Sequence, residues 1–400
     1  MHTITRLLAI PVLLGCVVAP AAADSPSCAC PLEAAMQKLP ALVFEVAGET
    51  TQCDKHAAQL ADQNKAAVQY VVQQLYASKA EAQNALISTS ENLLADFTTA
   101  RSCKVSGTTS IAGQKLECAQ SAAKLAAAVE GAIKMVQVSY KVGDDQCDCP
   151  NKAQQLAADS GENVTFVVND QETCCPIGNK LNLVRAKYRA ALQTVSATIA
   201  AEASNESDAK CKGCPVEAGM NGLPRLAFVV GGETTGCEKH AAKLHAANLA
   251  EKSDSKIEFA VQQSFEGKEQ AMLALVASTE SLLDQFATPS KCEVSGTTTI
   301  AGKKLHCSET AAKIALDVRQ AIDAVRVSFV VGDKKCDCPN EAQALAKASG
   351  AKRLFVVGDQ QTSCELTSRL NLARAKYRAA VQALAKQASA DSGASADSQS

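Results

Sequence analysis

Cysteine is the residue type with which this 400-residue chain could do chemistry, since it occurs 18 times. Four motifs contain two cysteines separated by one or two residues, directly before a proline. Proline is well tolerated in the first turn of a helix, so each motif predicts a thiol near a helix N-terminus, where the helix dipole favours the thiolate. Such thiolates can bind soft metals or exchange disulfides. The motifs are Cys28/Cys30-Pro31, Cys147/Cys149-Pro150, Cys211/Cys214-Pro215 and Cys336/Cys338-Pro339.

The chain is an internal duplication. CPLEAAMQKLPALVF from Cys30 recurs as CPVEAGMNGLPRLAF from Cys214, at an offset of 214 − 30 = 184. LNLVRAKYRAALQ from Leu181 recurs as LNLARAKYRAAVQ from Leu370, at an offset of 370 − 181 = 189. The second copy has therefore gained five residues, which fall in the polar stretch 251–256. An insertion in such a stretch indicates a loop.

The first 23 residues are typical of a signal peptide, with Arg6, an apolar run and then Ala21-Ala22-Ala23 before Asp24. The alternative is a lipobox that ends in a lipid anchor at Cys16. No later run is long and apolar enough to span a membrane. We therefore expect an exported protein, periplasmic or extracellular, in a compartment where disulfides persist. Cleavage leaves 18 − 1 = 17 cysteines, an odd number.

The pattern predicts an α+β fold of two homologous cysteine-rich lobes, 24–200 and 211–386, with a linker at 201–210 and a disordered tail at 387–400. Alternating segments such as VQVSYKV from Val136 indicate strands with one wet face. Several end in a two-residue turn signal, such as Ala47-Gly48 or Gly231-Gly232, followed by a cysteine and a helical pattern. Each lobe is then a two-layer sandwich of repeated hairpin-Cys-helix units, with helices on one sheet face. A parallel α/β arrangement is the alternative.

Disulfide bonds are the first interpretation of the cysteines in an exported chain. The cysteines of the two copies correspond, with Cys28 and Cys211 as near-equivalents, except that Ser363 stands where the first copy has Cys174, which makes Cys174 the candidate odd thiol. Bridges over loops of this size would stabilise an alanine-rich core by about 2 to 4 kcal/mol each. The candidate bridges are Cys30 to Cys53, Cys149 to Cys175, Cys214 to Cys237, Cys338 to Cys364, Cys103 to Cys118 and Cys292 to Cys307.

Metal binding is the alternative interpretation. Cys53 and His56, like Cys237 and His240, lie three positions apart on a predicted helix and so share a face. Sets of three thiolates and one imidazole suit Zn, and sets of thiolates alone suit Cu(I); no cofactor is required otherwise. The candidate sets are Cys28, Cys30, Cys53 and His56; Cys211, Cys214, Cys237 and His240; Cys147, Cys149, Cys174 and Cys175; and Cys336, Cys338 and Cys364.

The hairpin-Cys-helix unit resembles the short YHS and TRASH metal-binding modules. The resemblance is most visible in IAGKKLHC from Ile300 to Cys307, which leads into the helical pattern SETAAKIAL, and it covers some 20 residues per unit. The second, aromatic-flanked cysteine pattern of those modules is missing here. The resemblance implies metal binding through the cysteines.

Other function classes find little support. A net charge of −2 without a basic cluster argues against nucleic acid as a partner. No nucleophile, zinc-protease or nucleotide-binding motif occurs, so we expect no enzyme, apart from thiol-disulfide exchange as a second alternative. A basic stripe (Arg185, Lys187 and Arg189, matched by Arg374, Lys376 and Arg378) is interpreted as a solvated helix face, with an anionic surface as the alternative. The sequence thus predicts an exported, non-enzymatic, disulfide-stapled protein with an envelope or extracellular structural or binding role.

Overall fold

The computed structural model describes residues 31–102, 109–111, 114–116, 118–203, 215–250, 256–291, 297–300, 303–305 and 308–394. The predicted signal peptide lies outside these residues, as do most of the linker and the last part of the tail. The cysteines that fall outside are Cys16, Cys28, Cys30, Cys103, Cys211, Cys214, Cys292 and Cys307.

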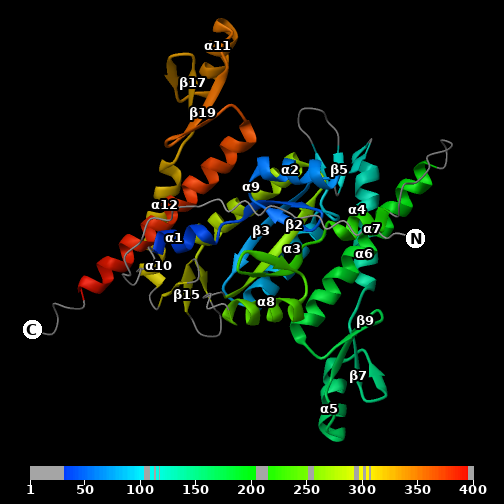
Figure 1. The fold of residues 1–400 in the computed structure, drawn as a ribbon. Coiled ribbons are helices and arrows are strands. Elements are labelled where there is room, and N and C mark those ends of the chain that lie inside the picture. The colour runs from blue at the N-terminus through cyan, green and yellow to red at the C-terminus, as the bar shows by residue number, and fades with distance from the viewer. Residues whose placement is uncertain are drawn as a thin grey trace, which may run out of the picture.

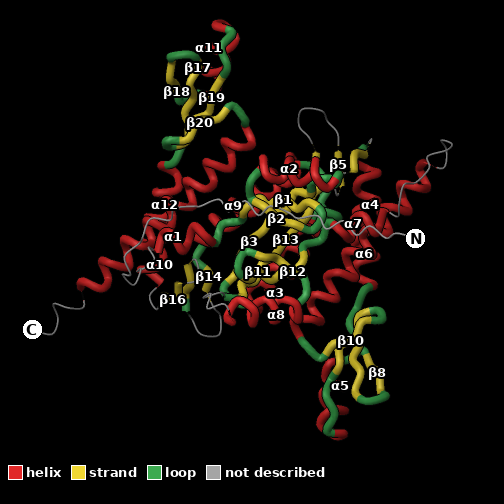
Figure 2. The backbone as a smooth tube through the Cα atoms, in the orientation of Figure 1, coloured by secondary structure: helices red, strands yellow, loops and turns green. Residues whose placement is uncertain are grey.

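The described part mixes helices with antiparallel strands (Figures 1 and 2). The first repeat contains α1 (Pro31–Gln37), β1 (Ala41–Val46), β2 (Glu49–Thr51), α2 (Asp54–Asn64), β3 (Gln69–Tyr76), α3 (Lys79–Ala95), β4 (Arg101–Ser102), β5 (Thr109–Ile111), β6 (Gln114–Leu116), α4 (Ala119–Met135), β7 (Ser139–Val142), β8 (Asp145–Cys147), α5 (Pro150–Ser160), β9 (Thr165–Val168), β10 (Gln171–Thr173) and α6 (Pro176–Ala203).

The second repeat follows the same element order. It contains α7 (Pro215–Asn221), β11 (Arg225–Val230), β12 (Glu233–Thr235), α8 (Glu238–Ala250), β13 (Ile257–Phe265), α9 (Lys268–Ala287), β14 (Ser290–Lys291), β15 (Thr298–Ile300), β16 (Lys303–Leu305), α10 (Ser308–Ala324), β17 (Ser328–Val331), β18 (Lys334–Cys336), α11 (Pro339–Ser349), β19 (Arg353–Val357), β20 (Gln360–Thr362) and α12 (Glu365–Ala394).

All strand pairs among the described residues are antiparallel. The α+β prediction is thereby confirmed, and the parallel α/β alternative is wrong. Hairpins rather than crossovers join most neighbouring strands, because the turn signals place glycine where the backbone needs a positive φ. In the first hairpin Ala47 and Gly48 have φ of 52° and 88°. No helix of the described residues is long and apolar enough to cross a membrane.

One six-stranded sheet joins the two repeats, in the order β12-β11-β13-β3-β1-β2. The two middle strands come from different repeats, and Gln73 of β3 stands opposite its own counterpart, Gln262 of β13. The buried Gln262 amide donates a hydrogen bond to Gln73 Oε1 at 2.7 Å. Val72 pairs with Gln263 on one side of this point, and the equivalent residues Gln74 and Val261 pair on the other. A pseudo-twofold axis therefore passes through the Gln73–Gln262 pair.

The helices that cover this sheet are exchanged between the repeats. Helix α3 of the first repeat contacts β13 and β11 of the second, and α9 of the second contacts β3 and β1 of the first. Leu86 of α3 packs in one buried cluster with Val261, and its counterpart Leu275 packs in another with Val72. Two ion pairs repeat the exchange at the surface. They join Lys79 to Glu238 at 2.7 Å and Lys268 to Asp54 at 2.6 Å.

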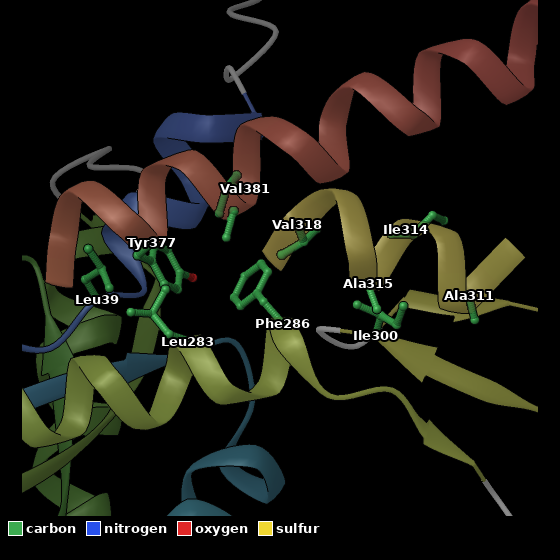
Figure 3. Close-up of a cluster of buried hydrophobic side chains, with 11 residues drawn as sticks. Leu39, Leu283, Phe286, Ile300, Ala311, Ile314, Ala315, Val318, Tyr377 and Val381 are labelled. Atoms are coloured by element: carbon green, nitrogen blue, oxygen red, sulfur yellow. The ribbon is translucent and has the colours of Figure 1, made fainter. Parts of the chain in front are cut away.

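The short N-terminal helices are exchanged as well. Helix α1 packs on α12 of the other repeat, where the Tyr377 hydroxyl donates to the Ala35 carbonyl at 3.4 Å. Figure 3 shows this cluster, in which Tyr377 faces Phe286, with ring centroids 5.1 Å apart, beside Leu39. Helix α7 packs on α6 in the corresponding way. Two homologous lobes are therefore not confirmed as separate bodies, because each repeat completes the core of the other.

Two small modules project from this shared body at opposite ends of the molecule (Figures 1 and 2). Each has a four-stranded sheet, in the order β10-β9-β7-β8 in the first repeat and β18-β17-β19-β20 in the second. The helices α5 and α11 pack against these sheets. Aromatic pairs hold the middle strands together, with ring centroids 5.8 Å apart for Tyr140–Phe166 and 5.6 Å for Phe329–Phe355.

Candidate thiol sites at helix starts

A hairpin that ends two residues before a cysteine, which in turn precedes a helix, recurs along the described residues. At four of these joints a threonine ends the hairpin, and its hydroxyl accepts a hydrogen bond from the cysteine backbone N–H at 3.1 to 3.2 Å. This local turn holds the cysteine at the entry to the helix. The pairs are Thr51 and Cys53, Thr173 and Cys175, Thr235 and Cys237, and Thr362 and Cys364.

In the CDC motifs a second cysteine takes the place of that threonine. Cys147 stands opposite Tyr140 in β7, as Thr173 stands opposite Phe166 in β9. Its thiol is directed at the Cys149 carbonyl, at 3.6 Å, and Cys336 is directed at the Cys338 carbonyl at 3.9 Å. Each CDC loop therefore places two thiols in one turn at a helix start. The Thr-x-Cys spacing, visible when the units are aligned, is a signal that sequence reasoning missed.

Some helix-start thiols serve as caps. Cys118 Sγ accepts from the Ser121 N–H at 3.4 Å and lies 3.2 Å from the Ser121 hydroxyl. These hydrogen bonds lower the pKa of the exposed Cys118, with a smaller contribution from Lys124. Hydrogen bonds from Thr367 lower the pKa of Cys364 in the same way. Cys53, Cys149 and Cys338 precede their helices without a side-chain cap hydrogen bond.

Cys336 has the opposite environment. It is buried at the end of β18, in the apolar cluster of its module with Phe329 and Phe355. Burial raises the pKa of its thiol, and the negative charges of Glu341 and the neighbouring Cys338 and Asp337 raise it further. The CDC loop of the second repeat thus contains two unlike thiols. Cys336 is buried and holds its proton, whereas Cys338 is exposed.

These environments predict an order of thiol reactivity. In reduced, metal-free protein at neutral pH, iodoacetamide should alkylate Cys118 and Cys364 well before Cys336, because the thiolate is the nucleophile. The rate for Cys118 should reach half its maximum at a lower pH than the rate for Cys336. Pulsed alkylation with peptide mass spectrometry measures both, and Ser121→Ala should slow Cys118 while leaving Cys364 unchanged. Equal rates at Cys118 and Cys336 would show that the cap does not activate the thiol.

The structure does not bring Cys149 and Cys175 together. They follow β8 and β10, the two outer strands of the sheet, with β7 and β9 between them. Three strand spacings are about 14 Å, whereas bridged cysteines have Cα atoms within about 7 Å. Because β7 and β9 are antiparallel, β8 and β10 also end at opposite ends of the sheet. The same holds for Cys338 and Cys364. The predictions of a Cys149–Cys175 bridge and a Cys338–Cys364 bridge are therefore wrong.

The described cysteines are all unbridged, and the other four candidate bridges each need at least one cysteine outside the described residues. The unbridged ones are Cys53, Cys118, Cys147, Cys149, Cys174, Cys175, Cys237, Cys336, Cys338 and Cys364.

The two metal sets made of thiols alone are not assembled either. Over the part of the chain that the structure describes, no three side chains of His, Cys, Asp or Glu come together as a metal site. The sheet order that parts Cys149 from Cys175 also parts the two CDC thiols from Cys174. Cys53 with the exposed His56, and Cys237 with the exposed His240, have their remaining predicted ligands outside the described residues. The contact that the structure does show is within each CDC loop, where the thiol of the first cysteine is directed at the backbone carbonyl of the second.

Searches with this chain found no matching family model, no matching curated protein and no matching solved structure. The likeness to YHS and TRASH modules therefore stays a prediction from the residues that carry it.

Proposed function

We propose that this is an exported, non-enzymatic protein that binds soft metal ions, and that each CDC loop holds one Cu(I) between its two thiolates. The proposal rests on one observation. In each projecting module, the CDC joint has a cysteine at the position where other hairpin-Cys-helix joints have a threonine, two residues before the cysteine that precedes the helix. Structure alone does not require that exchange, because threonine supports the same joint elsewhere in the chain.

The number of ligands favours copper over zinc. Structural zinc takes four ligands, whereas Cu(I) is a soft ion that accepts thiolates and is satisfied by two in a linear arrangement. The sulfurs of Cys149 and Cys338 make no cap hydrogen bond and are free to turn toward a metal. The proton held by the buried Cys336 leaves when a metal binds, so affinity at the second loop should rise with pH.

Each CDC loop is expected to account for one bound copper ion. When reduced, full-length protein competes anaerobically with a chromogenic chelator for Cu(I), Cys147→Ser/Cys149→Ser should bind one equivalent less than wild type. Cys336→Ser/Cys338→Ser should do the same. The matched control is Cys364→Ser, which removes the thiol from a joint of the same shape that carries Thr362 in place of a second cysteine.

The control is expected to bind as much copper as wild type. If both loop variants also bind as much as wild type, the proposal is wrong. A disulfide-stapled structural role would then be the better interpretation if thiol counting on protein isolated without reductant found most cysteines oxidised.

A further inference from the structure

A polar cleft of about 540 Å³ lies between the first module, α6 and the start of the second repeat. Its walls are the β9–β10 turn, one face of α6, and the segment from α7 into β11. The residues that give it its chemistry are Asp170, Asn182, Arg185, Arg189, Asn221 and Arg225.

Two arginines come from α6. Arg185 and Arg189 lie four residues apart and therefore on one helix face, where like charges repel and destabilise a helix. Arg185 is half-buried, and this burial lowers the pKa of its guanidinium because the charged form loses water. No carboxylate of the described residues forms an ion pair with either arginine. Within the part of the chain that the structure describes, this charge pair of α6 lines the cleft without a carboxylate partner.

The third arginine comes from the other repeat and is fixed in place. Arg225 at the start of β11 forms an ion pair with Glu45 at 2.8 Å and donates a second hydrogen bond to Gln262 at 3.3 Å. Its side chain remains half exposed. Of the described residues that line the cleft, Asp170 is the one with a carboxylate. Among the described residues, three guanidinium groups therefore stand against two carboxylates, Asp170 at the cleft wall and Glu45 paired with Arg225, in a site that forms only where the two repeats meet.

We propose that this cleft binds a small multivalent oxyanion, with phosphate or carboxylate groups. Guanidinium groups bind both by paired parallel hydrogen bonds, and such bonds are stronger in a cleft that excludes part of the water. The amides of Asn182 and Asn221 supply further donors at the walls. Binding would offset both the repulsion between Arg185 and Arg189 and the cost of burying Arg185.

The duplication supplies a matched control. The second repeat carries Arg374 and Arg378 at the positions of Arg185 and Arg189, and Arg374 is half-buried with its pKa lowered in the same way. The residue equivalent to Arg225 is Ala41, since 225 − 184 = 41. The third arginine is thus particular to the cleft at α6, and the loss of Arg374 tests the loss of a half-buried arginine by itself.

Calorimetric titration of full-length, reduced, metal-free protein at low salt, with pyrophosphate and separately with citrate, tests the proposal. We expect one site for at least one of the two probes, weakened at least tenfold by Arg185→Ala and by Arg189→Ala. Arg374→Ala should change the affinity less than twofold. Binding of pyrophosphate alone assigns a phosphate ligand, and binding of citrate alone assigns a carboxylate ligand.

The proposal is overturned if neither probe binds, or if Arg374→Ala weakens binding as much as Arg185→Ala does. Arg189→Ala guards against a folding artefact, because Arg189 is exposed and its removal leaves the core intact. An unchanged affinity in that variant would also contradict the proposal.

Discussion

A protease cut between the repeats of the folded protein is expected to leave the two pieces bound to each other. An engineered cleavage site within 204–210 allows the cut to be made after folding. The pieces should stay together because β3 and β13 pair over seven residues in the middle of one sheet. The exchanged helices α1 and α7 add buried contacts on both sides. Light scattering after gel filtration should give the mass of the whole chain.

The cut itself is checked on a denaturing gel, where two bands should appear. If the pieces elute separately from the native column, the shared sheet is not what holds the repeats together. Cut protein that elutes as one species in buffer and as two in high urea would agree with a non-covalent, folded interface.

Shortening either of two equivalent leucines should destabilise both repeats together. Leu86 and Leu275 are almost completely buried, and each packs against a strand of the other repeat. Leu→Ala in a packed core costs about 2 to 5 kcal/mol in free energy of unfolding. We expect Leu86→Ala and Leu275→Ala each to lower the urea midpoint of a single transition, followed by circular dichroism.

Leu273 is the matched control, because it lies on the same helix as Leu275 and is 42% exposed. Leu273→Ala should cost less than about 1 kcal/mol. Two separate transitions, of which each core variant shifts only one, would mean that the repeats unfold independently. That result would favour self-contained lobes over the exchanged arrangement.

The sequence predicts the local parts of this fold well. The turn signals at Ala47-Gly48 and Gly231-Gly232 coincide with hairpins, because residues that accept a positive φ are a property of the turn itself. It does not predict that β3 pairs with β13. Alternation along a strand tells which residues share a face but does not name the neighbouring strand. Gln73 and Gln262 look like ordinary polar strand residues until the pseudo-twofold axis makes them partners.

For the candidate site, too, the sequence predicts the local features but not the long-range partners. The Cys-Pro spacing correctly places Cys149 and Cys338 directly before helices, because a helix start is a local signal. The predicted partners of these thiols depended on the order of strands in the sheet. That order places Cys175 at the opposite edge of its sheet from Cys149, and Cys364 at the opposite edge of its sheet from Cys338. Neither pair can therefore form a disulfide bond or share a metal ion. The cleft at Arg225 could not be predicted from the sequence either, because its walls come from both repeats.

Copper X-ray absorption spectroscopy of the anaerobically loaded, full-length protein tests the central claim most directly. Wild type and the Cys147→Ser/Cys149→Ser/Cys336→Ser/Cys338→Ser variant are compared at equal protein concentration. We expect Cu(I) with two sulfur ligands and no nitrogen or oxygen ligand, and two fewer copper ions per chain in the variant. An unchanged copper content in the variant, or copper bound mainly through nitrogen and oxygen, would contradict that claim.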